Sequence, residues 1–233
     1  GHWDLNSGKH NRKYPNFPFY IRNRYGRKNA TNRIAQEGPY YSDFAFGTIK
    51  FNGVDSYGIT QTDLTPKFET NKMSAFVWVY PGRDGVILSE QGSTTPNENW
   101  YYSQIEVVEG RMKFGLYTDE GIASVISNID VEYFHWYYVG FTYDGSEMKC
   151  FISGQECGSL ALNRVMPGSA GQALHYCIGN GTPTNMGDGR YGSFRFGQMH
   201  LYADSLTPEE VYYNWYNTRA RYEDPDHYLN GGG

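Results

Sequence analysis

The segment 196–215 constrains the fold more than any other part of the chain. Residues 196–206 alternate between apolar and polar side chains, which is typical of a strand with one buried face. Thr207 follows as a candidate N-cap, Pro208 suits the first helical position, and Glu210 completes a capping box. The sequence therefore predicts a strand, a turn and a helix that begins at this point.

The predicted helix has one apolar face. Val211 and Trp215 lie on this face at helical spacing, together with either Thr218 or Arg219. A stripe of this width is typical of a short helix that lies on a sheet.

The rest of the chain consists of short apolar segments separated by glycine-containing turns. A chain of 233 residues with 28 glycines and 17% aromatic residues is long enough for one large domain. Turn signals such as those at 81–85 and 144–145 separate segments that are rich in aromatic and β-branched residues. The predicted strands are 76–80, 86–88, 105–108, 113–117, 124–127, 137–143 and 193–202. This spacing predicts an all-β fold of two packed antiparallel sheets.

Four further segments carry a resemblance to a known family. They are GTIKFNGVDSY at 47–57, SAFVWVYP at 74–81, WYYVGFTYDGS at 136–146 and MKCFISGQ at 148–155. With the C-terminal strand and helix they resemble, in the same order, the laminin-G-like, concanavalin A-like jelly rolls. The resemblance implies a two-sheet antiparallel jelly-roll sandwich with one short C-terminal helix.

The end of the predicted helix narrows the resemblance. Its sequence YNTRARY at 216–222 is most similar to domains of tailed-bacteriophage structural and adhesin proteins. The resemblance implies a virion protein, although fold alone does not fix function, since the same sandwich hosts lectins, glycosidases and protein-binding modules.

The chain divides into three parts at the level of sequence. We expect an N-terminal arm at 1–40, a laminin-G-like jelly roll at 41–223 and a flexible glycine-rich tail at 224–233. The net charge of −5 hides an uneven distribution, because the arm carries eight Lys or Arg against two acidic residues and the remainder is acidic.

The basic arm has three interpretations. It can wrap the acidic sandwich or a neighbouring copy in a homo-oligomer, it can dock on another virion protein or an acidic glycan, or it can bind nucleic acid. An acidic body would repel phosphate, so no nucleic-acid partner is expected. The chain holds no run of 18 apolar residues, and no membrane insertion is expected either.

The chain has three cysteines, and the spacing of two of them suggests one candidate disulfide. A two-residue turn at 153–154 would place Cys150 opposite Cys157 across a hairpin. Pairs at this spacing are hydrogen-bonded positions, which are less often bridged, and Cys177 would remain unpaired. We expect three free thiols, in keeping with folding in a reducing cytoplasm before release in particles.

The sequence offers no catalytic centre. The resemblance implies that a glycosidase of this superfamily would carry Glu-x-Asp-x-x-Glu, and the nearest segment is NIDVE at 128–132. Asn128 stands where the first glutamate is expected, and Asp130 and Glu132 are expected in the turn before Trp136. Since no other hydrolytic, zinc or phosphate-loop motif occurs, we expect no enzyme activity.

Calcium is the cofactor that the resemblance implies, because relatives hold it with loop carboxylates and carbonyls. Asp55 and Asp188 are the candidate ligands, since both lie in loops rich in oxygen-bearing side chains.

Two loops combine aromatic and amide side chains in the way that sugar binding requires. They span 91–101 and 180–191, and the resemblance implies that they crowd one rim of the sandwich. The alternative is that the aromatic residues only cover sheet edges. The predicted ligand-binding residues are Asn97, Asn99, Trp100, Tyr101, Asn185, Asp188, Arg190 and Tyr191.

Two functions remain at this stage. The first is a non-catalytic adhesin or lectin-like module that binds glycans on a host or environmental surface. The second is a capsid or tail decoration protein that binds other virion proteins. Both place the protein on the virion surface, with an extracellular cellular protein as the alternative location.

Overall fold

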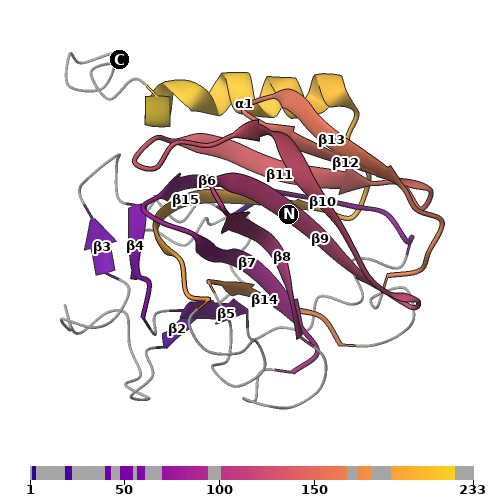
Figure 1. Cartoon of the computed structure of the whole chain (residues 1–233), viewed down its shortest axis with the longest axis horizontal. Coiled ribbons are helices and arrows are strands. Elements are labelled where there is room, and N and C mark those ends of the chain that lie inside the picture. Colours follow the sequence, from indigo (N-terminus) through magenta and orange to yellow (C-terminus); the bar gives the residue numbers. More distant parts are fainter. Residues whose placement is uncertain are drawn as a thin grey trace.

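A computed structural model describes residues 2–3, 19–22, 40–42, 48–54, 57–60, 70–93, 101–166, 173–179 and 190–223. Two antiparallel sheets and one helix make up these residues (Figure 1). The predicted all-β sandwich with one C-terminal helix is therefore confirmed.

The first sheet, sheet A, has eight strands in the described residues. In spatial order they are β13 (Gln155–Ala161), β12 (Glu147–Ile152), β11 (Tyr137–Tyr143), β6 (Met73–Pro81), β15 (Ser193–Tyr202), β4 (Thr48–Asn52) and β3 (Tyr40–Ser42), with β1 (His2–Trp3) also pairing with β15.

The second sheet, sheet B, has seven strands in the same part of the chain. Their spatial order is β10 (Gly121–Asp130), β9 (Arg111–Thr118), β8 (Tyr101–Val108), β7 (Gly85–Gln91), β14 (His175–Ile178), β5 (Tyr57–Thr60) and β2 (Phe19–Arg22). Each predicted strand corresponds to an observed strand, and most observed strands extend beyond the predicted bounds.

The main core lies between the two sheets. Period-two alternation sends every second side chain of a strand to this side. On β8, for example, Ile105 and Val107 are buried in the core, and on β9 Met112 and Phe114 meet them. Glu106, between Ile105 and Val107, consequently points to the opposite face of sheet B.

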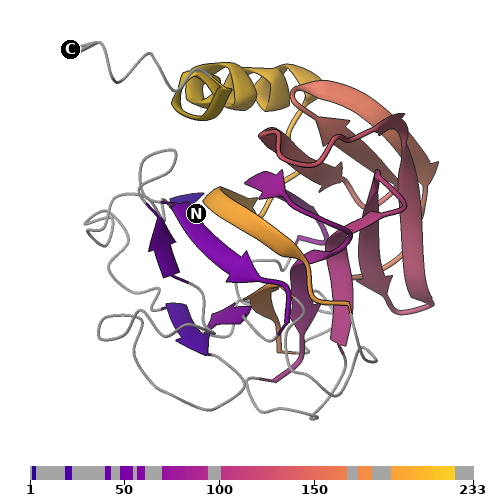
Figure 2. The same cartoon turned by 60° about the vertical axis from the view of Figure 1, so that its left-hand side comes forward.

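A second, smaller core joins the helix α1 (Pro208–Glu223) to the outer face of sheet A. Figure 2 shows the yellow helix lying next to β12 and β13. Trp78 stacks on Tyr222 with ring centroids 4.5 Å apart, and the Trp78 indole N–H donates to Thr218 Oγ1 at 2.8 Å. Thr218 therefore lies on the inner face, whereas Arg219 lies over the ring of Tyr216.

The predicted capping box forms at the start of α1. The Glu210 carboxylate accepts from the Thr207 backbone N–H at 2.8 Å, and the Glu210 N–H donates to Thr207 Oγ1 at 3.3 Å. Two backbone donors that the first turn leaves unpaired are thereby satisfied.

The β12–β13 hairpin differs from its predicted register. Ile152 pairs with Gln155 as expected, but a β-bulge next to Cys150 places this residue opposite Gly158. The prediction that Cys150 directly faces Cys157 is therefore wrong, because the bulge adds one residue to β13. All three cysteines are free and buried, and burial raises the pKa of each thiol.

The described strands of the N-terminal arm join both sheets. β1 pairs with β15 of sheet A, and β2 pairs with β5 of sheet B. The division at residue 40, the basic surface of the arm and the tail at 224–233 stay predictions.

Candidate functional site

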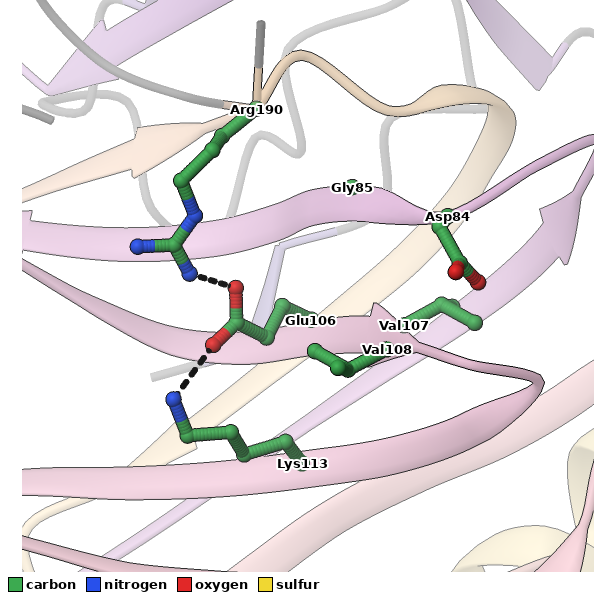
Figure 3. A pocket seen from close by; sticks show the side chains of 7 residues that line it. All are labelled: Asp84, Gly85, Glu106, Val107, Val108, Lys113 and Arg190. Atoms are coloured by element: carbon green, nitrogen blue, oxygen red, sulfur yellow. Dashed lines mark hydrogen bonds and ion pairs between the residues drawn. The ribbon is translucent and has the colours of Figure 1, made fainter. Parts of the chain in front are cut away.

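A hollow of about 420 Å³ opens on sheet B where β7 begins and β8 ends. Arg190 reaches it from the segment before β15, because its carbonyl accepts the Val86 N–H at 2.8 Å and holds it beside β7. The residues that line the hollow are Asp84, Gly85, Glu106, Val107, Val108, Lys113 and Arg190 (Figure 3).

The Glu106 carboxylate lies between two cations. Lys113 is directly opposite Glu106 on β9, and its Nζ donates to Glu106 Oε1 at 2.8 Å. The Arg190 guanidinium donates to Oε2, the other carboxylate oxygen. Figure 3 shows the three side chains converging on this point. Only 2% of the Glu106 side chain is exposed, so the two ion pairs offset the cost of burying its charge.

Both cations also reach solvent. The side chains are 27% exposed for Lys113 and 40% exposed for Arg190. An ammonium has three donors and a guanidinium has five, so each retains donors after binding Glu106. The trio is therefore a fixed group of charges with unused hydrogen-bonding capacity at its surface.

Tyr102 lies next to this trio. Its ring occupies the space that a side chain at Gly115 would take, because a Cβ there would be 2.3 Å from the ring. Burial raises the pKa of Tyr102, and the charges of Glu106 and Glu90 raise it further. The ring is thus neutral and buried beside the trio, and no described residue is a hydrogen-bond partner for its hydroxyl.

Asp84 forms the rim of the hollow. Its carboxylate accepts the N–H groups of Glu109, at 2.8 Å, and Gly110, at 3.3 Å, and the Tyr133 hydroxyl at 2.7 Å. The two backbone bonds hold the turn between β8 and β9. The bond from the Tyr133 hydroxyl raises the pKa of Tyr133. Asp84 therefore shapes the site, and its oxygens are already engaged by the protein.

A second hollow of about 590 Å³ adjoins the first, and Val108 lines both. An ion pair crosses it, with Arg111 Nε 2.8 Å from Asp130 Oδ1. Ile126 exposes 55% of its surface at the same place. This hollow thus combines an exposed aliphatic side chain with a charged pair.

Two of the predicted ligand-binding residues have described side chains. Arg190 lines the first hollow, as above. Tyr191 is 9% exposed and buried against β7, where it bridges to Val86. Tyr191 is therefore buried, and it lines neither hollow.

The other predicted residues lie beyond what the structure describes. Tyr101 is the first residue of β8, but its side chain is outside the described part. The residues whose placement falls outside the described ranges are Asn97, Asn99, Trp100, Asn185, Asp188 and Asp55.

Sequence reasoning missed Glu106, Lys113 and Asp84. A signal was present for Glu106, which is a charged residue between the core residues Ile105 and Val107. Its pairing with Lys113 followed from the tight turn between the two strands, but the contact with Arg190 joins residues 84 positions apart.

The segment 128–132 does not assemble a carboxylate pair over a groove. Asp130 is the last residue of β10, where it forms an ion pair with Arg111. It therefore lies in a strand and not in the turn where it was expected. Glu132 lies in the turn, as expected, with its side chain 80% exposed. Its backbone N–H donates to the Tyr137 hydroxyl at 3.0 Å.

No set of three His, Cys, Asp or Glu side chains gathers at a single point within the described ranges. Both predicted calcium ligands lie outside those ranges, so the calcium site stays a prediction. The helix that the structure describes is not apolar enough to cross a bilayer.

The sequence itself decides the family. A sequence model of the Laminin_G_3 family, described as the concanavalin A-like lectin/glucanases superfamily, matches residues 52–212. The chain belongs to this superfamily. The matched residues include both hollows and the first turn of α1. No curated protein sequence matches the chain.

Solved structures share the fold of this superfamily domain. The binding domain of Paraclostridial Mosquitocidal Protein 1 matches with a TM-score of 0.63 and 15% identity over 92% of this chain and 51% of that one. The receptor binding domain of botulinum neurotoxin D matches with a TM-score of 0.59 and 12% identity, over 88% of this chain and 49% of that one. The chain thus spans about half the length of these toxin domains.

A third structure matches over nearly its whole length. It is domain 4 of AbnA, a GH43 extracellular arabinanase from Geobacillus stearothermophilus, in complex with arabinotriose. The TM-score is 0.61 and the identity 18%, over 91% of this chain and 95% of that one. At these identities the likeness establishes the fold.

Proposed function

We propose that this domain is a non-catalytic carbohydrate-binding module whose site is the first hollow on sheet B. The observation that carries the proposal is the buried Glu106 carboxylate, fixed by Lys113 and Arg190 at the floor of an open hollow. Of the two predicted loops, 180–191 leads into Arg190 at this hollow, whereas 91–101 connects the end of β7 to the start of β8, away from it.

The chemistry of the trio suits sugar hydroxyls. A hydroxyl oxygen accepts hydrogen bonds, and Lys113 and Arg190 keep spare donors at the surface, while the buried Glu106 carboxylate fixes their positions. Mutual ion pairing fixes the three side chains before a ligand arrives, which lowers the entropy cost of binding. The charges of Glu106 and Asp84 balance those of Lys113 and Arg190, which favours a neutral sugar over a polyanion.

Absence of catalysis is part of the proposal. Glycoside hydrolysis uses two carboxyl groups on either side of the scissile bond, one of which donates a proton. In the hollow, both Glu106 oxygens accept from cations, and the Asp84 oxygens accept from the β8–β9 turn and Tyr133. These contacts engage the oxygens of both carboxyl groups within the protein, so the proposal assigns neither group the role of proton donor to a leaving group.

The comparisons support a binding role. The superfamily includes lectins, two similar structures are binding domains of toxins, and the arabinanase domain was solved with arabinotriose. The sequence YNTRARY at 216–222 supports the narrower proposal that the module is an adhesin on the surface of a tailed-bacteriophage particle. An extracellular cellular protein is the alternative setting.

The test is a glycan array probed with the domain in multivalent form, with and without calcium, because single sugar sites are weak and avidity amplifies them. We expect binding that Arg190→Ala weakens at least tenfold. Arg164→Ala is the matched control, since Arg164 forms an ion pair with Glu120 away from the hollow. A blank array in both conditions, or equal binding by both variants, would contradict the proposal.

A second function, a decoration protein that binds other virion proteins, is favoured by α1. Three tyrosines on its outer side are roughly half exposed, and Arg219 stacks on one of them; these are Tyr212, Tyr213 and Tyr216. Tyrosine and arginine are enriched in protein interfaces. If this function holds, Tyr213→Ser should weaken binding to purified particles that lack the protein, measured by co-sedimentation, and Arg190→Ala should not.

A further inference from the structure

The two hollows on sheet B belong to one surface that crosses four strands. Residues that pair directly across neighbouring strands point to the same face of a sheet. On this face Glu106 pairs with Lys113, and Lys113 pairs with Ile126 on its other side. The three side chains therefore form a row across β8, β9 and β10.

A second row runs beside the first. Val108 pairs with Arg111, and Arg111 pairs with Asp130, so this row also crosses β8, β9 and β10. Val108 lies two residues after Glu106, and Arg111 lies two residues before Lys113, so both rows lie on the same face. Val108 lines both hollows, which makes them continuous.

The surface is longer than a single sugar. From β7, beside Arg190, to Ile126 on β10 there are three strand spacings, about 14 Å in all, and one sugar ring covers only part of this distance. Each half also has the same composition, with a charged pair for hydroxyls and an aliphatic side chain for the apolar face of a ring. In the first half these are Glu106 with its cations and Val108, and in the second they are Arg111–Asp130 and Ile126.

We infer that the two hollows form one groove that binds a neutral glycan chain several sugars long, with one subsite at Arg190 and Lys113 and another at Ile126 and Asp130. This inference rests on the proposed function and adds to it the form of the ligand. More than half of the Ile126 and Asp130 side chains is exposed, so the second subsite is accessible.

The experiment measures affinity against ligand length. Neutral oligosaccharides of two to six residues, prepared from arabinan, xylan, dextran, mannan and cellulose, are titrated into the domain by calorimetry. For the series that binds, we expect affinity to rise from the disaccharide to the tetrasaccharide by at least tenfold and then to level off. Ile126→Ala should weaken the affinity for the tetrasaccharide about tenfold and leave the affinity for the disaccharide unchanged.

A control variant lies on the same strand. Ile122 is as exposed as Ile126, at 55%, but does not line either hollow, so Ile122→Ala should bind every length as the unchanged protein does. Circular dichroism and melting temperature should match for the two alanine variants.

The outcomes separate the two claims. If affinity does not depend on length while Arg190→Ala abolishes binding, the carbohydrate site stands and the second subsite is wrong. If no series binds, or if Arg190→Ala binds as tightly as the unchanged protein, the proposed function itself fails and the inference fails with it. If Ile122→Ala and Ile126→Ala weaken binding equally, the second hollow is not the subsite.

Discussion

Glu90 should make the fold less stable as the pH rises. Its side chain is buried on β7, 2% exposed, and burial raises its pKa from 4.5 to about 8. Its oxygens accept only weak donors among the described residues, the Tyr117 backbone N–H at 3.3 Å and the Gln104 amide at 3.2 Å. No cation of the described part lies within ion-pair distance, so the neutral form is favoured in the folded state.

The sign and size of the effect follow from linkage. Between pH 4.5 and about 8 the unfolded chain has lost this proton and the folded chain keeps it, so the free energy of unfolding falls as pH rises. Each pH unit corresponds to about 1.4 kcal/mol, so the whole interval corresponds to on the order of 5 kcal/mol. Above about pH 8 the folded carboxyl also ionises, and this loss stops growing.

The variant Glu90→Gln isolates this contribution, because an amide has nearly the same shape and does not titrate. Urea denaturation at pH 5, 6, 7 and 8 gives the free energy of unfolding of both proteins. We expect similar values at pH 5 and a growing advantage for Glu90→Gln towards pH 8. Glu156→Gln, at an exposed carboxyl on β13, is the control and should leave the slope unchanged. Parallel curves for Glu90→Gln and the unchanged protein would refute the argument.

Three further predictions concern the fold. Thr207→Ala removes the cap of α1 and should cost about 1 kcal/mol; an unchanged urea midpoint would contradict the capping box. Gly140→Ala should abolish soluble folded protein or cost at least about 3 kcal/mol, because a Cβ there would lie 2.1 Å from a backbone oxygen of β6; a melting temperature equal to that of the unchanged protein would contradict this packing. The thiols should react slowly with Ellman's reagent in the folded protein, while urea should expose three equivalents, at Cys150, Cys157 and Cys177, and one equivalent would instead indicate a disulfide.

The sequence predicted the parts of the fold that depend on local patterns. The capping box of Thr207 and Glu210 and the alternation along β15 each involve residues that are close in the chain, so spacing alone was enough. The choice between Thr218 and Arg219 on the inner face was not local, because it depends on Trp78, 140 residues earlier.

The site was only partly predictable, because its charges come from distant segments. Arg190 was recognised as a loop residue. Its partner Glu106 is on a central strand, and the two meet only because the fold places the segment before β15 beside β7 and β8. Tyr191 illustrates the opposite case. It has the composition of a sugar-stacking residue, yet the bridge to Val86 turns it into the interior. The bulge beside Cys150 was missed because the pairing was extrapolated from the turn at 153–154 as an unbroken ladder, and the bulge lies beyond that turn.

The most direct test of the account is to map the ligand on the domain. A neutral oligosaccharide selected from the array is titrated into isotope-labelled protein, and amide chemical-shift changes are assigned by NMR. We predict that the largest changes fall on β7, β8 and β9 around Glu106 and Lys113, with Arg190 among them. Changes confined to α1, or spread without any cluster on sheet B, would contradict the claim that this hollow is the carbohydrate site.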